Sequence, residues 1–202
     1  MKIPAERLSN QSIQQARRTA AAQRLAKNRE ASEDYVKTVY PNEKFLSRTT
    51  QLQAANQWTK KLVLPRNVRL AESRIPRGKD QCDILKKELH QAGKLSRLGN
   101  SIFFTPERGG YKKRVTDAVI NGVPFEFRNI TGKPRRIESE FGDAKKKGKG
   151  VNVFINIESD IGKDETRRRI GLVLNRHQDY TGKIIVSFQD GKIYFWDSSS
   201  FR

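Results

Sequence analysis

Two carboxylates and an arginine lie close together in the middle of the chain. Asp117 and Glu126 flank an Asn121-Gly122 pair, and Arg128 follows Glu126 by two positions. Asn-Gly supplies the two positive φ angles of a type I′ turn, so the β-rich runs on either side predict a tight hairpin. In its register the two carboxylates face each other and repel. A bound cation, a shared proton or neighbouring positive residues would compensate for this repulsion.

The types of these residues suit metal-assisted phosphate chemistry. Side chains alternate between the faces of a strand, so Arg128 shares the face of Glu126, whereas Phe125 and Phe127 take the opposite face. A hard divalent ion such as Mg²⁺ takes one or two carboxylates and keeps waters for a substrate phosphate. It polarises a phosphodiester and lowers the pKa of an attacking water. Mn²⁺ and Zn²⁺ are alternative ions, and a surface ion-pair cluster is the alternative interpretation of the three residues.

The charge of the whole chain indicates a polyanionic partner. The 202 residues include 41 Lys and Arg against 22 Asp and Glu, a formal charge of +19. Residues 1–80 contain 17 of the basic and 7 of the acidic residues, so they carry +10 and residues 81–202 carry +9. Neutralised phosphates release condensed counterions, so nucleic acid is the expected partner. A solvated basic surface is the alternative.

The composition also excludes several classes of protein. The single cysteine, Cys82, cannot form an internal disulfide, and with two separated histidines it cannot form a Cys/His zinc site. No apolar run approaches the roughly 18 residues of a membrane span, and the first residues lack the apolar core of a signal peptide. We therefore expect neither a membrane span nor a signal peptide in this chain.

The pattern of apolar residues divides the chain in two. Residues 11–37 predict a basic helix with little to bury, and residues 38–79 lack any sustained periodicity and suggest a linker with irregular structure. We therefore expect residues 1–80 to form a basic helical and irregular N-terminal region. Residues 81–202 are expected to form one α/β domain.

The expected domain alternates helices and strands. Its predicted elements are a helix through Leu85, Leu89, Ala92 and Leu95, a strand at 101–105, a hairpin at 115–128, a helix after Pro134, a strand at 151–157, a helix at 163–176 and a hairpin at 184–196. This order predicts an α/β (α+β) fold with a mixed β-sheet flanked by helices.

Basic and aromatic residues near the hairpin are candidates for nucleic-acid contact. Tyr111 could stack a base beside its basic neighbours. The Arg167–Arg169 run either holds phosphates or is a solvated helix face. The expected nucleic-acid contacts are Lys112, Lys113, Arg114, Lys145, Lys146, Lys147 and Arg168.

The two histidines suggest less. His177 follows a predicted helix, where an imidazole could act as acid or base in a metal-independent RNase or could simply interact with the helix dipole. His90 lies in the middle of a helix and is expected to be structural.

The segment from Val115 to Gly132, preceded by a strand ending in Thr105-Pro106-Glu107, resembles the C-terminal nuclease domains of contact-dependent growth inhibition (CdiA-type) toxins. The similarity is to the tRNA nuclease branch with a PD-(D/E)xK-like, type IIS restriction-enzyme core. It continues to the final hairpin and covers about residues 83 to 199. The resemblance implies a restriction-endonuclease-like core and a metal-dependent endonuclease that acts on tRNA, with DNA as the alternative substrate.

The resemblance also implies roles for individual residues. Asp117 and Glu126 would be metal ligands, and Glu88 and Glu107 are acidic positions that such cores use as an additional ligand. Arg128 stands where the family usually has its catalytic lysine. An arginine can stabilise a phosphate in the transition state, but it stays protonated and is a poor base. A lysine of the 145–147 run could take the missing place.

A toxin of this family would be secreted or delivered and would act in the cytoplasm of a target cell. An acidic immunity protein would then be expected to complement the basic surface. Two other functions are consistent with the sequence. One is a non-catalytic nucleic-acid-binding or virion-associated protein with a degenerate nuclease fold, and the other is a metal-independent RNase that uses His177.

Overall fold

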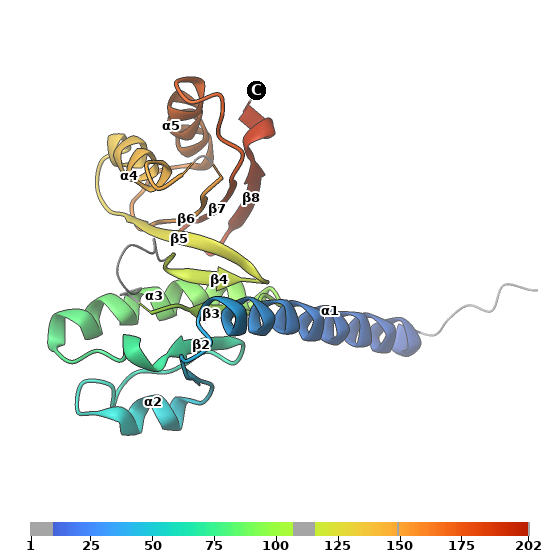
Figure 1. Cartoon of the computed structure of the whole chain (residues 1–202). Helices are drawn as coiled ribbons and strands as arrows, with labels where there is room; N and C mark the ends of the chain where they lie inside the picture. The colour runs from blue at the N-terminus through green and yellow to red at the C-terminus, as the bar shows by residue number, and fades with distance from the viewer. Residues whose placement is uncertain (1–9, 107–115, 149, 202) are drawn as a thin grey trace, which may run out of the picture.

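Figure 1 shows the computed structural model of the chain, which describes residues 10–106, 116–148 and 150–201. The helices in these ranges are α1 (Asn10–Val39), α2 (Thr49–Ala55), α3 (Lys79–Arg97), α4 (Arg135–Lys145) and α5 (Lys163–Asn175), with short 3-10 helices η1 (Glu72–Arg74) and η2 (Ser198–Phe201). The strands are β1 (Phe45–Leu46), β2 (Val68–Ala71), β3 (Ile102–Phe104), β4 (Ala118–Ile120), β5 (Val123–Ile130), β6 (Asn152–Ile157), β7 (Lys183–Ser187) and β8 (Ile193–Asp197).

The eight strands form one mixed sheet in which their spatial order is the same as their order in the chain. Strands β2 and β3 are parallel, as are β5, β6 and β7, and the remaining neighbours are antiparallel. Helices α3, α4 and α5 connect the parallel pairs. The predicted α/β fold with a mixed sheet flanked by helices is confirmed.

Helices cover both faces of the sheet. Helix α3 buries Leu85 and Leu89 against Phe125 and Phe127 of β5, in a cluster that also contains Phe104. On the opposite face, α4 and α5 pack over β5, β6 and β7 (Figure 1). Helix α1 shares that second face and covers β3 and β4. One face therefore carries α3, and the other carries α1, α4 and α5.

Turn chemistry explains the β4–β5 hairpin. Asn121 has a φ of 52° and Gly122 a φ of 81°, the two positive values that a type I′ turn requires. The register places Ile120 opposite Val123 and Ala118 opposite Phe125, as predicted. Helices α3, α4 and α5 also follow their predicted apolar faces, since each buries the residues expected from its periodicity.

The interpretation of residues 38–79 as a linker with irregular structure is wrong. This segment contains β1, α2, β2 and η1, and β2 pairs in parallel with β3. Leu62, Leu64, Val68 and Leu70 belong to the same buried cluster as α3. Strands of two and four residues are too short to show a periodicity, and their partners are distant in sequence. The sheet therefore extends across residue 80.

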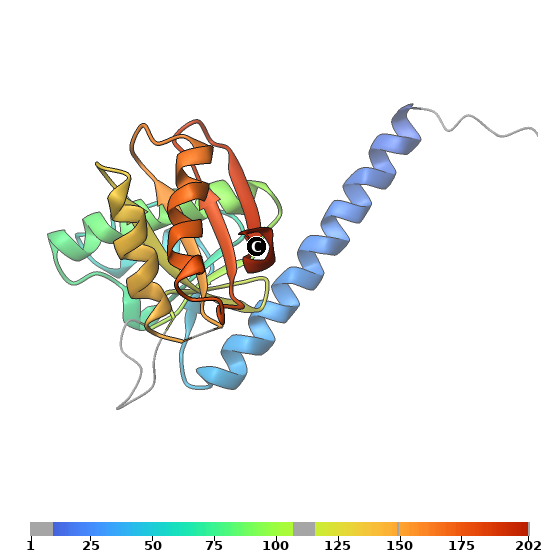
Figure 2. The same ribbon diagram turned by 90° about the horizontal axis from the view of Figure 1, so that it is seen from above.

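Helix α1 reaches far beyond the sheet. Figure 2 shows that its N-terminal half runs away from the rest of the molecule. Its C-terminal half is attached, because Val36 packs on Phe103 and Val119. No helix in the three described ranges has the length and apolar character needed to cross a bilayer.

Candidate active site

Glu126 is a buried carboxylate in the middle of the sheet. It lies on β5 and has no solvent exposure. Its Oε2 accepts a hydrogen bond from Lys147 Nζ at 2.5 Å and lies 3.5 Å from Arg128 Nη2. Its Oε1 is buried, and no described residue donates a hydrogen bond to it. A buried carboxylate oxygen without a donor is costly, so the site is suited to a ligand.

Asp117 lies beside Glu126, but not as the register predicts. The regular ladder ends at the pair of Ala118 and Phe125, and the Asp117 amide donates to the Phe125 carbonyl at 3.1 Å. The expected face-to-face ladder pair with Glu126 is therefore wrong. The Asp117 Oδ2 instead accepts a hydrogen bond from the Phe127 amide at 2.8 Å. A backbone donor satisfies the aspartate where the regular ladder ends.

Arg128 connects several carboxylates at this point of the sheet. Its Nη1 lies 3.9 Å from Asp117 Oδ2 and donates to the Phe127 carbonyl at 2.9 Å. Its Nε lies 3.9 Å from Glu140 Oε2 of α4. The side chains of Arg128 and Asp117 are 20% and 30% exposed, so the site opens to solvent through them while Glu126 forms its floor.

Burial and charge act in opposite directions on Glu126. Burial raises the pKa of the Glu126 carboxyl, and the nearby charge of Asp117 raises it further. The hydrogen bond and charge of Lys147 and the charge of Arg128 oppose this rise in pKa without cancelling it. A buried carboxyl with a raised pKa beside other charged groups is a candidate for proton transfer.

The structure separates the three lysines of the 145–147 run. Lys147 lies in the turn after α4 and contacts Glu126. Lys145 lies 3.7 Å from Asp179, and Lys146 forms a 2.6 Å ion pair with Asp143 on the exposed side of α4. Of the three, only Lys147 contacts Glu126, where its ammonium group and Arg128 approach the same carboxylate oxygen.

Glu88 and Arg74 support the site from the α3 side. Glu88 Oε1 accepts a 2.7 Å hydrogen bond from Arg74 Nη2. Arg74 Nη1 donates to the carbonyls of Asp117 at 2.7 Å and Thr105 at 3.2 Å, and its guanidinium lies over the Phe104 ring. The buried arginine thus fixes the backbone at Asp117 and engages the carboxylate of Glu88.

The donor set fits a hard cation held by few protein ligands. Within the described residues, no three His, Cys, Asp or Glu side chains gather closely enough to enclose a metal ion. Asp117, which is partly exposed, and the buried, unpartnered Oε1 of Glu126 are two hard oxygen donors close enough for their charges to interact. Mg²⁺ is commonly bound by one or two carboxylates and retains several waters, so these residues fit that ion.

Other predicted contacts lie elsewhere or outside the described ranges. Glu107, Lys112, Lys113 and Arg114, together with Tyr111, fall in residues 107–115, which lie outside the described part of the chain. Arg168 lies on α5 and forms a bidentate ion pair with Glu165 at 2.7 and 2.8 Å. Its charge is therefore balanced within its own helix.

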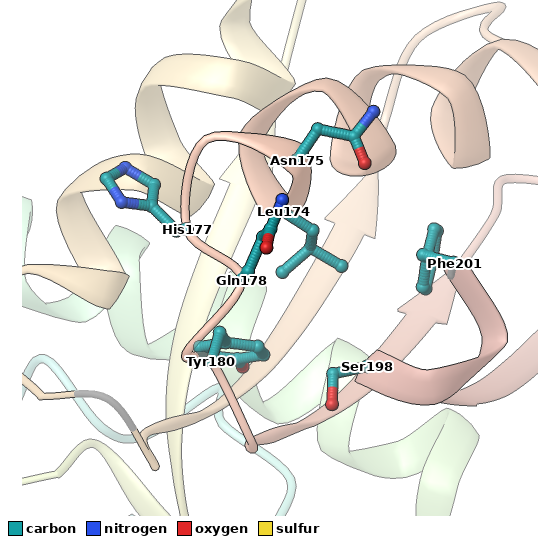
Figure 3. Close-up of a pocket in the computed structure, with 7 residues that line it drawn as sticks. All are labelled: Leu174, Asn175, His177, Gln178, Tyr180, Ser198 and Phe201. Carbon is teal, nitrogen blue, oxygen red and sulfur yellow. The ribbon is translucent and has the colours of Figure 1, made fainter.

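His177 lines a separate cavity of about 380 Å³ at the end of α5. Figure 3 shows its imidazole ring turned away from Tyr180 and Ser198 on the other side of the cavity. The described lining residues are Leu174, Asn175, His177, Gln178, Tyr180, Ser198 and Phe201, none of which is Lys or Arg. The cavity therefore lacks, within the described chain, the cation that an RNase based on His177 would use.

Sequence reasoning missed two residues of the site. Arg74 lies in the segment that we interpreted as linker, so nothing in its neighbourhood predicts that it is 6% exposed and bonded to Asp117. Glu140 lies on α4 directly before Phe141, which is buried. The helical period places Glu140 at the edge of the buried face of α4. That position is the signal in the sequence that could have indicated a contact with the sheet.

Comparison with solved structures finds a similar chain. A chain of the "CdiA-CT/CdiI toxin and immunity complex from Burkholderia pseudomallei" is 25% identical in sequence, with a TM-score of 0.46. The alignment covers 61% of this chain and 92% of that chain. No protein-family model and no curated protein matches this chain. The case for a function therefore depends on the geometry around Glu126.

Proposed function

We propose that this protein is a nuclease that hydrolyses phosphodiester bonds at the site formed by Asp117, Glu126, Arg128 and Lys147. The observation that carries the proposal is Glu126 itself, a fully buried carboxylate with one oxygen on two cations and the other without a donor. A purely structural ion-pair cluster would gain from satisfying both oxygens, because an unsatisfied buried acceptor destabilises the fold.

The two cations suit the charge changes of phosphodiester hydrolysis. Arg128 and Lys147 both approach Glu126 Oε2, so a phosphate bound over the carboxylates would meet two preorganised positive charges. Such charges stabilise the additional negative charge of the transition state. Arg128 offers a planar guanidinium fork to the phosphate, whereas Lys147 offers a compact ammonium group with three hydrogen-bond donors.

Glu126 can take part in moving a proton. Its raised pKa brings the carboxylate closer to the range in which it accepts a proton from an attacking water at neutral pH. Arg74 holds the Asp117 backbone, which keeps the second carboxylate beside it. Asp117 and Glu126 would also hold a divalent cation, which supplies Lewis-acid polarisation of the phosphate when bound.

The substrate proposed is RNA, with tRNA as the first choice and DNA as the alternative. The charge of +19 favours either polyanion, and the resemblance of the 115–132 segment to CdiA-type tRNA nucleases favours tRNA. The same resemblance supports a toxin that acts in the cytoplasm of a target cell and is neutralised by an acidic immunity protein.

The test is a cleavage assay with purified protein, total tRNA and plasmid DNA, with and without EDTA. Glu126→Gln keeps the size of the side chain and removes its charge, so cleavage should be lost. EDTA should also abolish cleavage if Asp117 and Glu126 hold a metal. Cleavage that survives in EDTA would contradict the metal, and binding without cleavage would favour the non-catalytic alternative.

Asp190→Asn is the matched control. Asp190 is an exposed carboxylate in the β7–β8 turn, paired with Lys192, so its substitution changes the net charge by the same amount away from Glu126. Equal loss of cleavage in both variants would show that net charge, and not the buried site, determines activity. Loss of cleavage in His177→Ala alone would favour the metal-independent RNase.

A further inference from the structure

The exposed N-terminal half of α1 is a second candidate surface for binding a partner. The attachment of α1 to the sheet begins near Asn28, whose side chain donates to the Gly99 carbonyl at 3.2 Å. Further along, Ser32 accepts a hydrogen bond from the Gly122 amide at 3.0 Å. Residues 12–24 are all exposed, and Figure 2 shows them running beyond the sheet. The segment 12–27, which also includes the exposed Lys27, is here called the arm.

The cations of the arm are uncompensated. No Asp or Glu occurs from residue 10 to residue 29, whereas Arg17, Arg18, Arg24 and Lys27 all fall in this range. All four are exposed, and none forms an ion pair with a described residue. Four positive charges on one exposed helix therefore create a local field that favours a polyanion.

The composition of the arm is unsuited to docking a protein. Between residues 12 and 24 the only hydrophobic side chain larger than alanine is Ile13, which is 37% exposed. Protein interfaces depend on a buried apolar or aromatic centre, which this segment cannot supply. Phosphate contacts need charge and reach, both of which the arm has.

The arm and the catalytic site belong to the same face of the sheet. Helix α1 packs on Val119 of β4, whose cross-strand neighbour on that face is Pro124. Pro124, Glu126 and Arg128 are each two residues apart, so their side chains lie on the same side of β5. Helix α1 therefore packs on the face of the sheet that carries the site. Chain geometry gives a path of about 37 Å from Asp117 through Gly122 and Ser32 to Arg18, with ~3.3 Å per strand residue and ~1.5 Å per helical residue.

We propose that the arm is a phosphate-binding element for double-helical RNA, contacting a segment about ten base pairs from the bond at the Glu126 site, at ~3.4 Å per step. This inference rests on the proposed function, because the Glu126 site is the second place at which the RNA would be bound. The ligand is a folded RNA long enough to reach both places. A single-stranded fragment would meet one of them.

The experiment measures binding and cleavage separately. Binding of a fluorescent RNA hairpin of about 20 base pairs is followed by anisotropy over a range of salt concentrations in the Glu126→Gln background. Arg17→Gln, Arg18→Gln, Arg24→Gln and Lys27→Gln are combined in one arm variant. Glutamine keeps a high helix propensity, and circular dichroism verifies that α1 remains folded. The slope of log K against log salt should become shallower by about three, because each lost phosphate contact removes ~0.7–0.9.

The matched control removes four cations from the other side of the molecule. Lys60, Lys61, Lys86 and Lys87 are exposed, and the last two lie on α3. Replacing them with Gln should change the salt slope by less than about one. Equal slopes in the arm and control variants would overturn the proposal, because general charge would then explain binding. An unchanged RNA affinity in the arm variant would also overturn it.

Cleavage distinguishes failure of the arm from failure of the nuclease. With Glu126 intact, the arm substitutions should raise KM about tenfold for the long hairpin and leave KM unchanged for one of about 6 base pairs. Cleavage of the long hairpin with unchanged KM and unchanged salt slope would reject the arm and keep the nuclease. Absence of cleavage in every variant, with the arm slope still reduced, would reject the nuclease and keep the arm as a binding element.

Discussion

The arm of α1 and the α4–α5 layer are both rich in cations, but they use them in opposite ways. On α5, Arg168 and Arg169 share the carboxylate of Glu165, and Arg169 also contacts Glu138 at 2.5 Å. On the arm, Arg17 and Arg18 have no Asp or Glu within ten positions of them in the sequence. Charges that are balanced within the fold orient side chains, whereas charges left unbalanced in solvent attract a partner. Net charge alone cannot distinguish these two arrangements.

The largest expected effect is that of a substitution at Glu126, a buried carboxylate whose Oε1 has no hydrogen-bond donor among the described residues. Glu126→Gln should reduce the cleavage rate by about 10²–10³-fold, because it removes the charge that positions Arg128 and Lys147. Single-turnover kinetics on tRNA would measure this loss. A decrease of less than about tenfold would place the reaction elsewhere in the molecule.

The same substitution has an expected pH signature. Burial raises the pKa of Glu126 in the folded protein above its ordinary value of 4.5, so the folded state binds the proton more tightly than the unfolded state. Wild-type stability should therefore fall relative to Glu126→Gln as pH rises from about 4.5 through the raised pKa of the folded state. Urea unfolding of both proteins between acidic and neutral pH would measure the difference. A constant difference would contradict the raised pKa.

Lys147 is the next largest expected effect. Lys147→Ala leaves the buried Glu126 without its closest partner, so it should destabilise the fold by about 1–3 kcal/mol and slow cleavage by about 10²-fold. Lys146→Ala is the matched control, since the Lys146–Asp143 pair is exposed to solvent and should contribute little to stability. Urea unfolding and the cleavage assay measure both. Equal effects in the two variants would show that Lys147 has no special role.

Local signals in the sequence predicted the framework of this site. The Asn121-Gly122 turn defines the hairpin. The alternation of side chains along β5 then places Glu126 and Arg128 on one face. Helical periodicity defines α4, whose end places the lysines nearby. The structure adds what depends on distant contacts. Which lysine of 145–147 turns inward depends on the turn after α4, and this cannot be inferred from three identical residues.

Two further features were beyond the reach of sequence reasoning. The regular ladder ends before Asp117 because its amide and carboxylate both bond to backbone groups of β5, a choice that the ideal hairpin register does not anticipate. Arg74 enters the site from η1, after a run of short elements held by pairing with distant strands. Non-local hydrogen bonds determine both positions.

A smaller effect is expected where the arm is attached to the sheet. Gly122 has a φ of 81°, and a Cβ added there would approach Ala31 Cβ of α1 to 2.9 Å. Gly132 has a φ of 86° but no atom within 4 Å of such a Cβ. Gly122→Ala should therefore destabilise the protein by about 1–3 kcal/mol more than Gly132→Ala, since it adds a steric clash to the same backbone strain. Urea unfolding measures the difference, and equal losses would contradict tight docking of α1 on this turn.

The smallest expected effect tests the comparison of the two basic regions directly. Hydrogen bonds from Arg168 and Arg169 lower the pKa of Glu165 to about 2, so its carboxylate remains charged throughout the neutral range. Glu165→Gln should release Arg168 from its partner, while Arg169 keeps Glu138. The salt slope of RNA binding should then become steeper by about one, as expected for one additional phosphate contact. An unchanged slope would show that Arg168 lies outside the path of the RNA. The ion pair with Glu165 would then not be the reason why α5 does not bind RNA.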